Sequence, residues 1–239
     1  MSTLTKMALG LMGQLKTRPA RGDSAPALAL PPPRSTGGVP LMQALQRRQS
    51  QREFATTPLP DQVLADILWA AGGVNRPALG GRTAPSAMNS QEVQIYVALP
   101  AGLYLYEPLR HALRLKVSRD VRSVTGYQDF TDEAALDLVF VADHSRVTKW
   151  VQAEQRVAYA HVTAGAMAQN VYLSCASQGL ATVIRAWIDR GALSAAMELS
   201  VDQQVLVAQT VGFPEVRPEA RSEAFEAVQM ARHPIERSR

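Results

Sequence analysis

The spacing of apolar residues predicts two helices in the first third of the chain, one over 41–48 and one between Asp61 and the Gly72-Gly73 pair. Asp61, directly after Pro60, is the expected N-cap of the second helix, and the Gly72-Gly73 pair is expected to end it. The residues that carry the pattern are Leu41, Ala44, Leu45, Val63, Leu64, Ile67, Leu68 and Ala71.

The middle of the chain alternates between apolar and other residues, as half-buried strands do. Segments 93–99 and 103–106 predict a hairpin around Pro100-Ala101-Gly102, and 111–117 is expected to add a third strand. Segment 136–142 is almost continuously apolar, which is typical of a strand covered on both faces.

A long helix is predicted over 151–178, with Gly179 at its end. Its second half is apolar nearly all round, so we expect it in a core or at a subunit interface. Segments 181–187 and 204–211 predict two further core strands, with a short helix over 192–199 between them. Central strands with helices at both ends predict an α+β domain built as a two-layer or three-layer sandwich.

Proline and glycine mark the ends of this domain. Residues 1–38 end in Pro31-Pro32-Pro33 and Gly37-Gly38, which predicts a flexible leader because such residues do not join helix or sheet interiors. The ordered domain is expected over 39–214. The remainder, 215–239, is expected to be a C-terminal tail, either flexible or with a short helix over 223–232.

The composition excludes several classes of protein. The net charge is +4, but both signs are dispersed and no Lys/Arg block with interleaved aromatics indicates nucleic-acid binding. No apolar run is long enough to span a bilayer, and Gln14 and Lys16 interrupt the apolar residues after Lys6. A weak secretory signal is the alternative, but we expect a cytoplasmic protein without a membrane partner. The one cysteine, Cys175, lies among small and apolar residues and is expected to be a buried thiol.

Common catalytic and metal-binding patterns are also missing. There is no dinucleotide-binding glycine motif, phosphate loop or nucleophile elbow, and the four histidines lack metal-ligand spacing. We therefore predict no metal site and no catalytic side chain. Any reactive group is expected to come from a cofactor.

Two short segments carry candidate chemistry. Arg48-Gln49-Ser50-Gln51-Arg52 places two guanidiniums and a hydroxyl close together, which suits a phosphate group, although a solvated helix end is an equal alternative. Arg76 and Arg82 have the same ambiguity. The turn at 85–91 combines small residues with two amides, which suits a flat heteroaromatic ligand; the alternative is a loop that enters a helix with Ser86 as its cap.

In this order, the two segments resemble the nitroreductase family of FMN-dependent oxidoreductases, and the resemblance extends over about residues 40–214. It implies a nitroreductase-like α/β sandwich, with a central, mainly antiparallel sheet flanked by helices, in an intertwined homodimer. Further matching segments are Leu68-Trp69-Ala70-Ala71-Gly72, Asn75-Arg76-Pro77, Gly102-Leu103-Tyr104, Thr125-Gly126, Gln169-Asn170-Val171-Tyr172 and Gln209-Thr210-Val211-Gly212.

The resemblance also implies cofactor-binding residues, in three groups. The FMN phosphate would be bound by Arg48, Ser50 and Arg52, with Gln49 where the family more often has a basic residue. The flavin edge would meet the turn residues Pro85, Ser86, Ala87, Asn89 and Gln91, usually from the partner subunit. The segment Gly179, Leu180, Ala181 and Thr182 would lie near the flavin. A further basic residue often completes the phosphate site; Arg217 and Arg221 cannot be assigned to it, and Arg185 is an alternative.

The activity implied by the resemblance is reduction of an electron-poor small molecule, such as a nitroaromatic or a quinone, with NAD(P)H as electron donor in a ping-pong scheme. One alternative is a flavin-dependent oxidative dehydrogenase of a biosynthetic intermediate. Another is a flavin-binding protein with little catalysis, in which Tyr127 and Phe130 of a variable lid segment would block the flavin. A purely structural protein would bind no flavin.

Overall fold

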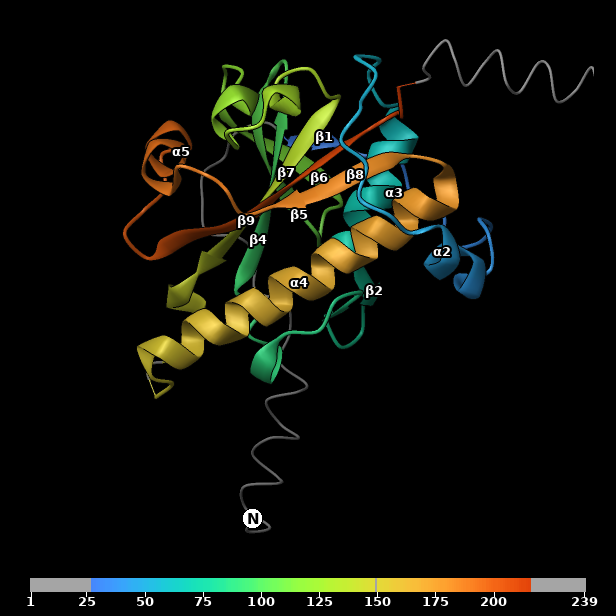
Figure 1. Ribbon diagram of the computed structural model, residues 1–239. Coiled ribbons are helices and arrows are strands. Elements are labelled where there is room, and N and C mark those ends of the chain that lie inside the picture. Colours follow the sequence, from blue (N-terminus) through green and yellow to red (C-terminus); the bar gives the residue numbers. More distant parts are fainter. Residues whose placement is uncertain (1–26, 149, 216–239) are drawn as a thin grey trace, which may run out of the picture.

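A seven-stranded antiparallel sheet forms the centre of the computed structural model, which describes residues 27–148 and 150–215 (Figure 1). The strand order is β1-β6-β5-β4-β7-β9-β8. The strands are β1 (Ala27–Ala29), β4 (Val93–Leu99), β5 (Gly102–Glu107), β6 (Ala112–Val117), β7 (Leu136–Asp143), β8 (Ala181–Arg185) and β9 (Gln203–Gly212). The predicted α+β class and mainly antiparallel sheet are thus confirmed.

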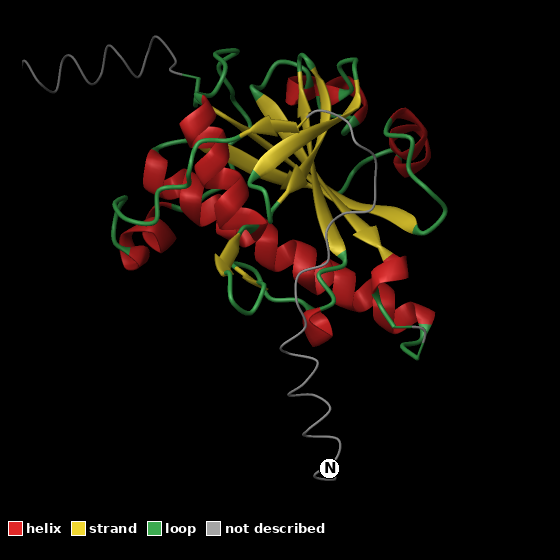
Figure 2. Ribbon diagram, turned by 180° about the vertical axis from the view of Figure 1, so that it is seen from behind, coloured by secondary structure: helices red, strands yellow, loops and turns green. Residues whose placement is uncertain are grey.

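Helices cover both faces of the sheet, so the sandwich has three layers (Figure 2). One core lies between the sheet and helices α3 and α4, and a second lies between the opposite face and α5. The helices are α2 (Leu41–Arg47), α3 (Asp61–Gly72), α4 (Ala153–Gln178) and α5 (Arg190–Ala196), with short 3-10 turns at η1 (Ala87–Asn89), η2 (Arg122–Val124), η3 (Asp129–Thr131) and η4 (His144–Arg146).

The long helix α4 packs closely on the sheet because its inner face is made largely of small side chains. Ala160, Ala164 and Ala168 are almost completely buried there, as is Cys175. The helix ends at Gly179, whose φ of 71° lies in the left-handed region that a helix C-terminus favours. The predicted helix and its glycine end are therefore confirmed, with the first residue at Ala153.

Residues 27–38, which the sequence predicted to be a flexible leader, pack on the domain. Strand β1 pairs with β6, and Leu30 is buried in the main core. Arg34 binds Asp66 of α3 through its backbone N–H, at 2.8 Å, and its guanidinium, at 2.6 Å. Prolines are compatible with this arrangement because an extended strap outside the sheet needs no ladder hydrogen bonds. Gly38 lies so close to Ser177 that a Cβ atom at position 38 would collide with the Ser177 hydroxyl.

Two other local expectations differ from the structure. Asp61 is the first residue of α3 and Pro60 is its N-cap, without a side-chain hydrogen bond, so the predicted Asp61 cap is wrong. The small hairpin of β2 (Val74–Arg76) and β3 (Gly81–Arg82) was not predicted, because its strands are too short to show alternation. The expectations for 1–26 and 216–239, including Arg217 and Arg221, lie outside the described residues.

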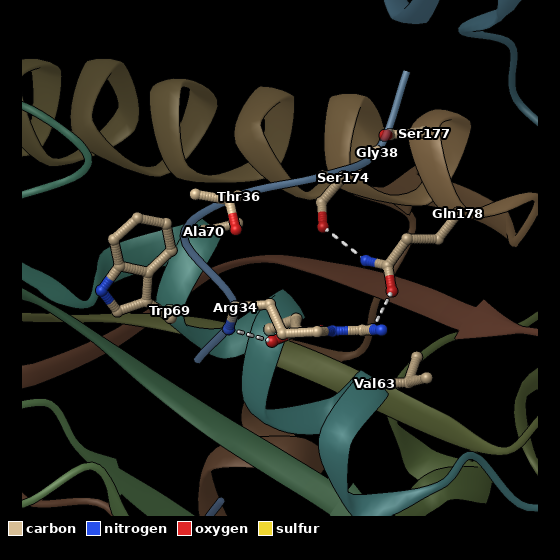
Figure 3. Close-up of a pocket in the computed structure, with 11 residues that line it drawn as sticks. Arg34, Thr36, Gly38, Val63, Trp69, Ala70, Ser174, Ser177 and Gln178 are labelled. Atoms are coloured by element: carbon tan, nitrogen blue, oxygen red, sulfur yellow. Dashed lines mark hydrogen bonds and ion pairs between the residues drawn. The ribbon is translucent and has the colours of Figure 1, made fainter. Parts of the chain in front are cut away.

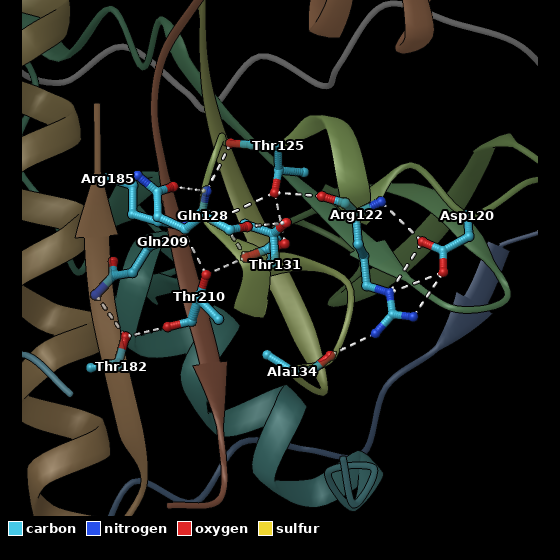
Figure 4. Close-up of polar contacts among 11 residues, drawn as sticks. Asp120, Arg122, Thr125, Gln128, Thr131, Ala134, Thr182, Arg185, Gln209 and Thr210 are labelled. Carbon is cyan, nitrogen blue, oxygen red and sulfur yellow. Dashed lines mark hydrogen bonds and ion pairs between the residues drawn. The ribbon is translucent and has the colours of Figure 1, made fainter. Parts of the chain in front are cut away.

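A buried ion pair ties β8 to β7 beneath the sheet's second face (Figure 4). Arg185 of β8 donates to Asp137 of β7 at 2.6 Å, and both side chains are nearly inaccessible. Thr125 and Thr210 donate to the same carboxylate, at 2.7 and 2.5 Å. Buried charges persist only when they are paired and hydrogen-bonded, so this network fixes the edge strand β8 against the sheet.

We expect Asp137→Ala to lower the free energy of unfolding by about 3–5 kcal/mol, because it leaves the Arg185 guanidinium buried without its carboxylate. Urea denaturation followed by circular dichroism measures the change. The control is Arg110→Ala, which removes an exposed guanidinium 3.7 Å from Glu107 and should cost no more than about 0.5 kcal/mol. Equal effects of the two substitutions would contradict the role given to the network.

Candidate functional site

The segment 48–52 follows α2 and runs beside the edge strand β8. The backbone N–H of Gln51 donates to Thr182 O at 3.1 Å, and a single bridge pairs Phe54 with Pro214. The structure thus brings the first predicted group of site residues next to the third group, at the start of β8.

Tyr172 of α4 holds this segment in place, although we did not predict it as a site residue. Its hydroxyl shares a hydrogen bond of 2.7 Å with Ser50 Oγ and accepts the backbone N–H of Ile184 at 3.0 Å. The Arg48 guanidinium lies over the ring, 5.4 Å from its centroid, at a distance typical of a cation–π contact. Tyr172 belongs to the segment 169–172 that resembles the family, but no local pattern shows its role, because its partners come from segments distant along the chain.

The charges of this segment suit an anion. Neither Arg48 nor Arg52 forms an ion pair with a carboxylate of the described residues. Arg52 and Ser50 are exposed, as is the neighbouring Gln49. Two guanidiniums and a hydroxyl on one short stretch can therefore bind a phosphate without first breaking an ion pair.

The third predicted group offers mainly backbone to any ligand. The side chains of Leu180, Ala181 and Thr182 are buried, and only Gly179 is exposed. The Thr182 hydroxyl donates to Thr210 O and accepts from Gln209, at 2.8 and 3.1 Å. A ligand beside this segment would consequently meet main-chain atoms.

The turn at 85–91 has an unusual backbone. Met88, Asn89 and Gln91 all have φ near +50°, in the left-handed region that side chains other than glycine adopt at a cost. Ser86 precedes the η1 turn without capping it through its side chain; instead Ser86 Oγ accepts the backbone N–H of Gln91 at 3.0 Å. Pro85 is exposed and Ala87 half-buried.

Gln91 maintains this backbone and is itself buried, which differs from the expectation of direct contact with a cofactor. Its amide oxygen accepts from Arg82 Nε at 3.0 Å. Its amide nitrogen donates to Gly80 O and Asn89 Oδ1, at 2.9 and 3.0 Å. All of these partners lie in the turn or the adjoining hairpin, so Gln91 acts by shaping the turn.

Within one chain the turn and the segment 48–52 lie on opposite flanks of α4. Tyr172 contacts Ser50, whereas Asn170 donates to Thr83 O, at 3.4 Å, just before the turn. Because Asn170 and Tyr172 are two residues apart, their side chains leave α4 in directions about 200° apart around the helix axis. The cavity of about 420 Å³ beside the turn contains no residue of the segment 48–52.

Arg185, the alternative phosphate ligand, is contradicted by the structure. Its guanidinium is occupied by Asp137, Thr125, Thr210 and Gln128 beneath the sheet (Figure 4). It also lies over the Phe130 ring, 5.8 Å from the centroid, while Phe130 packs on Phe54. The sequence shows Arg185 as a basic residue in a predicted strand, but it does not show that Arg185 is paired with the buried Asp137.

A cavity of about 510 Å³ lies elsewhere, between residues 34–38 and the helices α3 and α4 (Figure 3). Arg34 crosses it to bind Asp66 and reaches Gln178 at 3.4 Å. It contains none of the predicted site residues, and its one ion pair is already satisfied within the chain.

The described residues give little support for a reactive cysteine, a metal site or a membrane-spanning helix. Cys175 is buried as predicted, and burial raises the pKa of its thiol, which keeps it protonated. No group of three or more His, Cys, Asp or Glu side chains in 27–148 and 150–215 could hold a metal ion. Over the same residues, no helix is long and apolar enough to cross a membrane.

Comparison with known proteins gives a consistent result. The model of the Nitroreductase family matches residues 45–213. A crystal structure of a protein described as a nitroreductase from Ralstonia eutropha is 48% identical, covers 85% of this chain and 96% of its own, and has a TM-score of 0.77. A Methanocaldococcus jannaschii protein, also described as a nitroreductase, is 34% identical over 155 residues, which are 61% of this chain and 77% of the relative.

A more distant relative shares the fold. The NADPH:FMN oxidoreductase of Vibrio harveyi, solved with NAD+, has a TM-score of 0.54 at 23% identity, over 74% of this chain and 72% of that chain.

We expect Gln91→Leu to loosen the turn, because it leaves the buried Arg82 Nε without its acceptor. Amide hydrogen exchange over 86–91 should accelerate, and the free energy of unfolding should fall by about 2 kcal/mol. The control Gln155→Leu changes an exposed glutamine in the first turn of α4 and should alter neither. Unchanged exchange in Gln91→Leu would show that the turn does not depend on this side chain.

Proposed function

The chain belongs to the nitroreductase family, and on that premise we propose that it is an FMN-dependent oxidoreductase. It takes electrons from NADH or NADPH and reduces an electron-poor small molecule of the nitroaromatic or quinone type. The observation that carries the proposal is the segment 48–52, which presents a serine positioned by Tyr172 and two arginines that form no ion pair with a carboxylate in 27–148 or 150–215. FMN and NADPH appear in the name of the Vibrio harveyi relative.

The residues of this segment fit the FMN phosphate by charge and by donor type. Arg48 and Arg52 supply forked, permanently charged donors, and Ser50 adds a hydroxyl. Two contacts hold this segment in place: the hydrogen bond between Ser50 and Tyr172, and the backbone hydrogen bond from Gln51 to Thr182. Such a site holds an anion with little reorganisation.

The chain's own contribution to the reaction is binding and orientation. When bound, FMN would supply the two-electron chemistry that links the nicotinamide donor to the acceptor. The turn at 85–91 offers backbone groups and the Asn89 amide, and the segment 179–182 offers main-chain atoms. We assign no catalytic side chain.

A homodimer completes this site. In one chain the turn and the phosphate segment flank opposite sides of α4, so the turn of a second chain is needed to meet a cofactor bound at 48–52. The outer face of α4 exposes Ala158, Gly165 and Val162, the last 72% exposed, and α2 exposes Leu41 and Met42. Exposed apolar surface of this kind suits an interface between subunits. A cytoplasmic location, where reduced nicotinamides are available, is part of the same proposal.

Exchanging both arginines, Arg48→Ala with Arg52→Ala, should weaken FMN binding by about a hundredfold, because two charge-assisted contacts are lost. The flavin content after dialysis, read from visible absorbance, measures the effect. Arg47→Ala is the matched control, since this exposed arginine in the last turn of α2 lies outside the segment. Normal FMN occupancy in the double variant would refute the phosphate assignment.

Anaerobic addition of NADH or NADPH to the flavin-loaded protein should bleach its visible flavin bands. The faster donor identifies the nicotinamide preference. Bands that persist with both donors would favour an oxidative dehydrogenase or a flavin-binding protein. A colourless protein that takes up no added FMN would overturn the proposed function.

A further inference from the structure

A basic pocket lies beside the turn at 85–91. It has a volume of about 420 Å³ and is formed between the β2–β3 hairpin and the turn. Its lining includes Arg76, Arg82, Pro85, Ser86, Met88 and Asn89. The pocket is distinct from the segment 48–52, which contributes no residue to it.

Arg82 is a buried cation without a carboxylate partner among the described residues. It is 9% exposed, and its hydrogen bonds go from Nε to Gln91 and from Nη1 to Gly72 O, at 3.0 and 3.4 Å. Both acceptors are neutral, and Nη2 donates to none of the described residues. A buried charge without a counter-ion is costly, and burial together with the charge of Arg146 lowers the pKa of Arg82 to about 10.

The charges around the turn leave an excess of positive charge. Arg76 and Arg82 line the pocket, and Glu92 is a nearby buried carboxylate that acts on Arg82. Arg146 donates to Gln91 O at 3.0 Å and is itself paired with Asp143, 3.5 Å away. Glu92 is already engaged, since it accepts from Ser90 at 2.5 Å and from Thr163 at 2.8 Å. An anion that enters the pocket would therefore meet the guanidiniums of Arg76 and Arg82, neither of which forms an ion pair with another described residue.

Arg76 is held at the mouth of the pocket in a defined position. Its Nη2 donates to Arg82 O at 3.2 Å, and the guanidinium lies flat against Gly81. A Cβ on Gly81 would come within 2.7 Å of the guanidinium Cζ atom, so only glycine allows this placement. The residue itself is exposed, so its remaining donors can reach a ligand.

We propose that this pocket binds an anionic group, a carboxylate or a phosphate, through the Arg76 guanidinium with the buried charge of Arg82 behind it. The proposal rests on the proposed function in one respect. Because the pocket shares Pro85, Ser86 and Asn89 with the turn assigned to the flavin edge, the anion belongs either to the acceptor substrate or to the nicotinamide donor. Acceptors with a carboxylate, or a donor with a 2′-phosphate, are thereby preferred.

Titration calorimetry on the full-length protein tests both sources with matched pairs of probes. For the substrate, 4-nitrobenzoate is compared with 4-nitrobenzyl alcohol, which lacks the charge. For the donor, adenosine 2′,5′-bisphosphate is compared with adenosine 5′-monophosphate. We expect the more anionic member of one pair to bind about tenfold more tightly or better, as a charge-assisted contact with arginine does. The pair that shows the preference identifies the source.

Two variants test the residues independently. Arg76→Gln removes the charge. Gly81→Ala keeps the charge but displaces the Arg76 guanidinium, which can move because it is the flexible end of a side chain. Both should reduce the preference about tenfold. Arg110→Gln removes an exposed guanidinium elsewhere and should keep the preference. Circular dichroism shows whether each variant is folded.

The outcomes separate this proposal from the proposed function. No preference in either pair, or a preference that survives both Arg76→Gln and Gly81→Ala, would overturn the anion pocket, even if the protein binds FMN and is reduced by NAD(P)H. A preference that both variants abolish would support the pocket even in a protein that takes up no FMN, because the titrations need no flavin.

Discussion

The close packing of α4 on the sheet determines where every candidate site residue lies. Alanines on the inner face let the helix approach the strands, and polar side chains on its two flanks then reach different segments. Tyr172 holds the segment 48–52 on one flank, and Asn170 holds the chain before the turn on the other. Helix α4 thus separates the segment 48–52 from the turn at 85–91. This separation is the physical reason to expect that two chains build each site.

The architecture was largely predictable because long elements carry strong periodic signals. The strands at 93–99 and 136–143 and the helix ending at Gly179 follow directly from alternation, apolar runs and a glycine stop. Strand β1 was missed because three residues beside a proline run show no periodicity, and its stability comes from pairing with β6 and from the Arg34–Asp66 contact. Tertiary contacts of this kind leave no local pattern.

The candidate site was predictable in residue type and less so in role. Arg48, Ser50 and Arg52 were nominated from their chemistry and stay a prediction, whereas the side chains of Gln91 and Arg185 are buried in hydrogen bonds with their own chain. The sequence could not distinguish them, because burial and partners depend on distant segments. Tyr172 and Gly81 show the converse. Each looks like an ordinary core or loop residue, yet each fixes the position of an arginine.

The segment after α2 also closes an open side of the sheet. Strand β8 is an edge strand, and an uncovered edge is a template on which another chain can pair. The backbone N–H of Gln51 donates to Thr182 O on this edge, and the Tyr172 hydroxyl accepts the Ile184 N–H. The bridge between Phe54 and Pro214 joins the same segment to the chain that follows β9. Changes that loosen the segment would therefore expose the β8 edge to pairing with other chains and lower solubility, whatever ligand the segment binds.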